Sequence, residues 1–99
     1  MSGFRHVAMF IWTGQATQEQ KAAVAERLSE LPKVIPEIKR YEIGDDAGIN
    51  EGNYDFVVVA DFADRESYFV YRDHPVHLAM IAETIEPIIA ERAAVQYEL

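Results

Sequence analysis

The 99-residue sequence predicts one α+β domain with the element order strand, helix, strand, strand, helix pair, strand. Runs of β-branched and aromatic residues predict the strands, and apolar residues spaced by three and four predict the helices. Prolines and clusters of turn residues separate these segments. Since 49% of the residues are hydrophobic, and a chain of this size buries roughly 60% of its surface, we expect residues 1–99 to form a single domain.

The first half predicts a strand, a helix and a second strand. Residues Phe4–Trp12 form the first apolar and aromatic run. Thr17 precedes Gln20 by three residues, the spacing of a capping box, so a helix is expected over Gln18–Leu31. Pro32 then ends it, because proline lacks the backbone donor that a continuing helix needs. Ile38–Ile43 is a more polar segment, as expected of a strand at a sheet edge.

The second half repeats this order with a divided helix. After a loop over residues 45–53, Tyr54–Phe62 predicts a strand and Arg65–Arg72 a short helix. Pro75 is suited to the first position of a further helix. The apolar positions of that helix are Leu78, Ile81, Ile85 and Ile88, and Pro87 marks a kink or its end. Arg92–Leu99 predicts the closing strand. The resulting βαββαβ order is that of ferredoxin-like folds.

Composition and charge disfavour several classes of function. A net charge of −8 opposes nucleic-acid binding, which usually requires a basic surface. The absence of cysteine excludes disulfides, thiolate metal sites and a cysteine nucleophile. We recognise no signal peptide, and no segment reaches the ~18 apolar residues of a membrane helix. We therefore expect a cytoplasmic protein with no nucleic-acid or membrane partner.

Two predicted strands carry apolar residues on both faces, although the helices of this topology cover only one. Leaving the second face in water would forgo roughly 1.5 to 3 kcal/mol for each large side chain. The simplest cover is the same face of a second copy, which gives a homodimer whose two sheets form an α/β barrel. The alternative is that a terminus or the long loop covers this face. The residues of the expected interface are Val7, Met9, Ile11, Val57 and Val59.

The candidate chemistry lies around Tyr71 and His77. His77 lies near the start of the helix that Pro75 opens and four residues before Ile81, so its ring should face inward and stay neutral. A neutral histidine can act as a base, and Tyr71 can donate a hydrogen bond to a developing oxyanion. His6 can line the same cavity and orient a ligand. The alternative is that His77 is a structural core histidine whose hydrogen bond goes to a backbone carbonyl or to Tyr71.

Histidine spacing also raises the question of a metal. His74 and His77 are three residues apart, but His74 stands at a helix boundary and its structural interpretation is a capping residue. No carboxylate lies at a matching helical position. We therefore expect neither a metal site nor a cofactor.

The sequence resembles the stress-responsive dimeric α/β-barrel (Dabb) family. The resemblance covers nearly the whole chain and is carried by Arg5-His6-Val7, by Ile35-Pro36 and above all by Tyr71-x-x-His74-Pro75-x-His77. It implies a ferredoxin-like protomer and a barrel dimer. In plant polyketide cyclases of this family, the tyrosine and the last histidine of the motif carry out an aldol ring closure, which implies catalytic roles for Tyr71 and His77.

The same resemblance implies a set of pocket residues. They are His6, Ala8, Val24, Leu28, Phe56 and Val58; we add His74 from the motif and Ile81 from the helix stripe. The leading interpretation is a small, mainly apolar pocket for a carbonyl-bearing or aromatic molecule, with His/Tyr acid-base chemistry. The alternatives are a non-catalytic structural or interaction protein and a cofactor-independent monooxygenase-like barrel in which Trp12 would be the residue to test.

Overall fold

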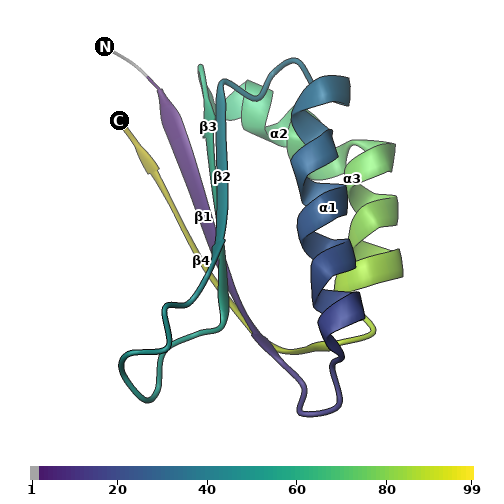
Figure 1. Ribbon diagram of the computed structural model, residues 1–99. Helices are drawn as coiled ribbons and strands as arrows, with labels where there is room; N and C mark the ends of the chain where they lie inside the picture. Colours follow the sequence, from purple (N-terminus) through teal and green to yellow (C-terminus); the bar gives the residue numbers. More distant parts are fainter. Residues whose placement is uncertain (1–2) are drawn as a thin grey trace.

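The computed structural model describes residues 3–99 and shows a four-stranded antiparallel sheet with all helices on one face (Figure 1). The strand order is β2-β3-β1-β4, which is that of a ferredoxin-like fold. The elements are β1 (Phe4–Trp12), α1 (Gln18–Val34), β2 (Arg40–Asp45), β3 (Phe56–Phe62), α2 (Arg65–Asp73), α3 (Pro75–Met80), the π-helical segment η1 (Ile81–Ile85) and β4 (Ile89–Glu98). None of these helices is long and apolar enough to cross a membrane.

β1 lies at the centre and fixes the register of the sheet. It pairs with β3 on one side, where His6 opposes Ala60, and with β4 on the other, where His6 opposes Gln96. Burial alternates along β1, because every second side chain points toward the helices. The buried residues of β1 and β3 therefore form the floor of the core, and α1 covers them with Val24, Leu28 and Leu31.

The helix starts follow the predicted capping chemistry, whereas one predicted helix end is wrong. Thr17 and Gln20 form the capping box, and the Asp64 carboxylate accepts a hydrogen bond from the Ser67 backbone N–H at 2.9 Å. α1 continues through Pro32 to Val34 instead of ending at Leu31. Proline removes only its own hydrogen bond, and Ile35, which is fully buried, closes the last turn by donating to the Leu31 carbonyl.

The predicted helix after Pro75 begins at Pro75 but departs from α-helical geometry at Ile81. In η1 the Glu86 N–H donates to the Ile81 carbonyl at 2.9 Å, the i→i−5 bond of a π turn. The core positions are Met80 and Ile85, five residues apart. The prediction of Leu78 in the buried stripe is therefore wrong, since it remains 51% exposed.

Strand pairing changes the bounds of three predicted strands. β2 spans Arg40–Asp45 rather than Ile38–Ile43, because its ladder with β3 runs from Arg40 opposite Asp61 to Asp45 opposite Phe56. β3 accordingly begins at Phe56 rather than Tyr54. β4 begins at Ile89 rather than Arg92. Ile89 opposes Trp12, and the register shifts between Ile11 and Trp12.

The face of the sheet that points away from the helices is apolar at its centre, as predicted. Val7 pairs with Val59 and Val95, and Met9 pairs with Val57 and Ala93. The side chains of the expected interface are half-buried in the single chain, and Val95 is 61% exposed. One polar row borders this apolar area: the Arg5 guanidinium holds the Asp61 carboxylate through two hydrogen bonds of 2.7 and 2.8 Å.

Candidate functional site

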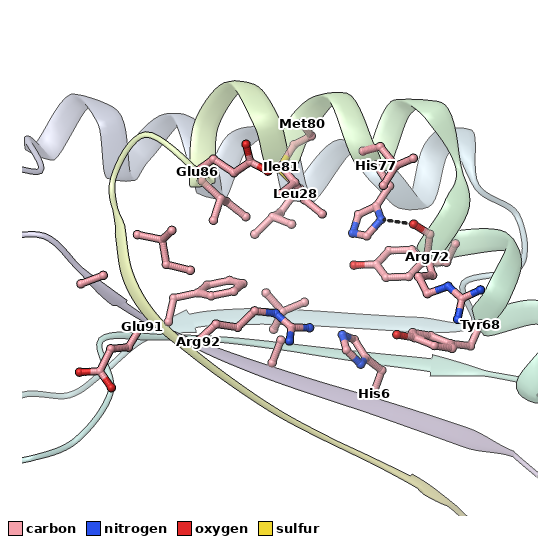
Figure 2. Close-up of a pocket in the computed structure, with 18 residues that line it drawn as sticks. His6, Leu28, Tyr68, Arg72, His77, Met80, Ile81, Glu86, Glu91 and Arg92 are labelled. Carbon is pink, nitrogen blue, oxygen red and sulfur yellow. Dashed lines mark hydrogen bonds between the residues drawn. The ribbon is translucent and has the colours of Figure 1, made fainter.

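A cavity of about 500 Å³ lies between the helices and the sheet, next to β4 (Figure 2). Small-molecule sites typically have volumes of this order and a mainly apolar lining. The residues that line it are His6, Ala8, Phe10, Leu28, Val58, Tyr68, Tyr71, Arg72, His77, Leu78, Met80, Ile81, Ile85, Glu86, Ile89, Ala90, Glu91 and Arg92. The helices contribute most of the aliphatic surface. The polar residues His6, Tyr68, Arg72 and His77 lie toward the end nearest α2, whereas Glu86 and Glu91 lie at the other end (Figure 2).

Seven of the ten sequence-predicted site residues line this cavity. His6, Ala8 and Val58 come from the sheet, Leu28 from α1, and Tyr71, His77 and Ile81 from the second helical layer. Val24 and Phe56 are instead buried in the core and do not line the cavity. His74 lies between α2 and α3, where its Nδ1 accepts a hydrogen bond from the Val76 N–H at 3.1 Å. It serves there as a helix cap.

His77 is held in the orientation that a base requires. Its Nδ1 lies 3.2 Å from the backbone carbonyl oxygen of Arg72, so this nitrogen carries the proton and donates. Nε2 is then left with a free lone pair. Figure 2 shows the ring projecting from α3 into the cavity. Burial lowers the pKa of His77, partly opposed by the hydrogen bond to Arg72, so the imidazole is neutral at pH 7.

Tyr71 stacks against that imidazole and is itself hydrogen-bonded. The ring centroids of Tyr71 and His77 are 4.1 Å apart, and the Tyr71 hydroxyl lies 2.9 Å from the Tyr41 hydroxyl of β2. Burial raises the pKa of Tyr71 to about 12, and the Tyr41 hydrogen bond works in the opposite direction. Tyr71 therefore remains protonated at neutral pH and is suited to donate a hydrogen bond.

His6 lies on the sheet side of the cavity, opposite this pair. Its Nδ1 is 2.9 Å from Nε2 of Gln96, which also donates to the Tyr68 hydroxyl at 3.0 Å. The amide is a donor, so Nδ1 of His6 accepts and its proton resides on Nε2. Burial, and then the positive charge of Arg92, lower the pKa of His6 to about 4. The cavity thus holds two neutral histidines with opposite tautomers.

Five polar residues line the cavity without having been predicted from the sequence: Tyr68, Arg72, Glu86, Glu91 and Arg92. Tyr68 lies three residues before Tyr71 on α2, and this helical spacing is the signal that places both on one face. Arg92 falls in the predicted closing strand, but the sequence pattern does not indicate which face it points to. Its pairing opposite Phe10 puts it on the cavity side. Within residues 3–99, no three His, Cys, Asp or Glu side chains gather closely enough to hold a metal ion.

The fold defines the class of protein: a ferredoxin-like α+β domain with a cavity between its helical layer and its sheet. Residues 4–99 match the Stress responsive A/B Barrel Domain (Dabb) family. The chain belongs to this family. No curated protein sequence matches it.

Solved structures agree with this assignment. A dimeric ferredoxin-like protein of unknown function from Thermobifida fusca is 46% identical, with 99% of this chain and 92% of that chain covered and a TM-score of 0.91. A Dabb family protein from Mesorhizobium loti is 20% identical (98% and 96% covered, TM-score 0.82). A hydroxynitrile lyase from Passiflora edulis is 18% identical (98% and 93% covered, TM-score 0.86) and shares the fold.

Proposed function

We propose that the cavity binds a small carbonyl-bearing molecule and that His77 and Tyr71 catalyse proton transfer at the carbon next to its carbonyl. The observation that carries this proposal is the neutral His77 imidazole, whose Nδ1 is occupied by the Arg72 carbonyl while Nε2 faces a cavity of about 500 Å³. A second hydrogen-bond donor, Tyr71, stacks on the same ring at a centroid distance of 4.1 Å.

The step is an enolisation. Nε2 of His77 takes a proton from the carbon next to the carbonyl and becomes an imidazolium. The electron pair of the broken C–H bond moves into the new C=C bond, and the carbonyl π pair moves to oxygen. The Tyr71 hydroxyl donates a hydrogen bond to that oxygen. In aldol ring closure the enolate carbon then attacks a second carbonyl carbon, the first C=O re-forms, and the π pair of the attacked carbonyl moves to its oxygen. That alkoxide takes up the proton held by the His77 imidazolium, which restores the neutral base. In simple exchange the enolate carbon takes the proton back.

The rest of the cavity suits such a molecule. Leu28, Met80, Ile81 and Ile85 supply an aliphatic wall, which excludes water from an apolar or aromatic body. A water-poor site strengthens the hydrogen bond between Tyr71 and a developing oxyanion. A hydroxynitrile lyase is built on the same fold, which supports the idea that this fold accommodates small-molecule chemistry.

The principal alternative is a non-catalytic protein in which His77 and Tyr71 only pack α2 against α3. The monooxygenase-like alternative has less support, because Trp12 packs against Phe10 and Phe56 at ring distances of 5.5 and 5.8 Å and does not line the cavity. Both alternatives predict that no enolisation occurs at the His77 site.

Deuterium exchange tests the proposal without knowledge of the natural substrate. The methyl ketone 4-acetylbenzamide is incubated with protein in deuterated buffer, and loss of the acetyl proton signal is followed by NMR. The wild-type protein should exchange these protons faster than buffer, and His77→Gln should lose about 10² to 10⁴ of any such acceleration. His74→Asn is the matched control, because asparagine preserves the helix cap outside the cavity. Binding without exchange, or equal exchange by His77→Gln, would refute the assigned base.

We further propose that a second copy of the chain covers the outer sheet face. The apolar rows Val7–Val59–Val95 and Met9–Val57–Ala93, together with Ile11, form a contiguous surface of the kind that soluble monomers rarely expose. The Thermobifida fusca protein, 46% identical, is dimeric, which supports the same assembly for this chain. Two sheets stacked through these rows would form the α/β barrel.

A further inference from the structure

Arg92 places a guanidinium on the floor of the cavity. It opposes Phe10 in the sheet, and both side chains therefore point to the helix-covered side of β4 and β1. Figure 2 shows Arg92 extending from β4 along the sheet side of the cavity toward His6. Its charge reaches the other polar groups, since it lowers the pKa of His6, Tyr71 and His77.

The two arginines of the cavity differ in what they bind. Arg72 forms two hydrogen bonds of 2.9 and 3.0 Å with the Asp73 carboxylate, and its guanidinium lies 4.8 Å from the centre of the Phe69 ring. The Arg92 guanidinium has no hydrogen-bond or ion-pair partner among residues 3–99. Of the two, it is therefore Arg92 that is available to a ligand.

Two carboxylates also border the cavity, and neither neutralises Arg92. Glu91 follows the opposite phase of β4, and Figure 2 shows its carboxylate pointing away from the cavity. Glu86 lies on the helix side, after η1, whereas Arg92 lies on the sheet side. Both histidines are neutral at pH 7. The sheet side of the cavity therefore carries a single positive charge in a chain whose net charge is −8.

We propose that the ligand carries a carboxylate and that Arg92 binds it, so that the substrate is a small oxo acid or an aromatic keto acid. The proposal rests on the small-molecule function assigned above and specifies its substrate class. A planar guanidinium matches a carboxylate through two parallel hydrogen bonds. One guanidinium balances one negative charge. A phosphate, with a charge of about −1.5 to −2, would keep excess charge in a mainly apolar cavity.

The arrangement also orients the ligand. A carboxylate on Arg92 lies against the sheet, and an apolar body then extends past Leu28 and Ile81 on the helix side. The ketone end of the molecule is directed to the side where His77 and Tyr71 project from the helices. Arg92 would thus act as a binding residue that positions the carbon whose proton His77 removes.

The test compares two probes of nearly the same shape, 4-acetylbenzoate and 4-acetylbenzamide. Dissociation constants are measured by calorimetry or NMR titration on the whole protein. The acid should bind about 10- to 100-fold more tightly than the amide, the range expected for a hydrogen bond to a charged group. Arg92→Gln should abolish this preference by weakening the acid alone, and Arg92→Lys should retain part of it. Arg72→Gln is the matched control: this guanidinium already pairs with Asp73, so the variant should keep the preference for the acid.

The outcomes separate this inference from the proposed function. If both probes bind wild-type protein equally, or if Arg92→Gln keeps the preference, the carboxylate assignment is wrong while the small-molecule site stands. If phenylphosphonate binds more tightly than 4-acetylbenzoate, the ligand is a phosphate compound and the inference is overturned. If neither acetyl probe binds at all, the proposed function fails and this inference fails with it.

Discussion

Acidification should destabilise the folded protein through His6, a buried histidine whose pKa is lowered. The folded-state pKa of His6 is about 4, against an ordinary value of about 6.5. The unfolded chain therefore binds the proton first, and stability that is fully present above about pH 6.5 is lost as the pH falls toward 4. In the fold, an added proton on Nδ1 would face the Gln96 amide, which donates to this nitrogen.

The magnitude follows from the two pKa values. The gap corresponds to roughly 3 kcal/mol at its limit, and to about 2 kcal/mol between about pH 7.5 and 5. Because the His6 ring lines a cavity and is not enclosed in a solid core, the full difference is not realised, and we expect a loss of about 1 to 2 kcal/mol in this interval. The Asp61 carboxylate does not contribute there, because the Arg5 hydrogen bonds lower its pKa.

Urea unfolding at both pH values, at one protein concentration, measures this loss. His6→Gln keeps a hydrogen-bonding side chain but cannot take up a proton, so its stability should fall by about 1 to 2 kcal/mol less than that of wild type. Burial also lowers the pKa of His77, which therefore contributes equally to both proteins and cancels in the comparison. Equal losses in wild type and His6→Gln would show that His6 is not a buried neutral base and would refute the reasoning.

Two further predictions concern the donor and the outer face. Tyr41→Phe removes the hydroxyl 2.9 Å from that of Tyr71 and should slow ketone proton exchange by up to about 10-fold while leaving the affinity for 4-acetylbenzamide unchanged. Unchanged exchange would show that the Tyr41 hydroxyl does not assist Tyr71 as a donor. Val59→Lys, at the centre of the outer face, should convert a species of twice the 11.3 kDa chain mass into a monomer by light scattering, whereas the exposed helix variant Val34→Lys should not. A wild-type protein that scatters as a single chain would refute the dimer.

Local sequence patterns predict much of this fold. Thr17 with Gln20, Asp64 and Pro75 mark the helix starts because capping and fixed proline geometry act within a single turn. The boundaries that differ depend on distant partners. Arg40–Asp45 replaces Ile38–Ile43 because of where β3 lies, and Pro32 stays helical because Leu31 and Ile35 are buried on either side of it.

The site is predictable to the extent that it follows residue periodicity. Tyr71 and His77 were identifiable from their motif, and His6 and Ala8 from the period-two alternation of β1. Met80 was not, because its spacing of five from Ile85 arises from a π turn that regular helical spacing does not reveal. Arg92 was not identifiable either, since its facing direction depends on which residue of β1 it opposes.

The alternation of side chains along β4 makes strand alignment a determinant of ligand chemistry. Arg92 and Gln96 point to the helix-covered face, where Arg92 lines the cavity, and Val95 and Tyr97 point to the outer face. A slip of one residue against β1 would exchange these two sets, since the side-chain period of a strand is two. The guanidinium would then leave the cavity for the outer face, although no side chain in the helices had changed. The register of one edge strand therefore decides whether this cavity attracts an anion.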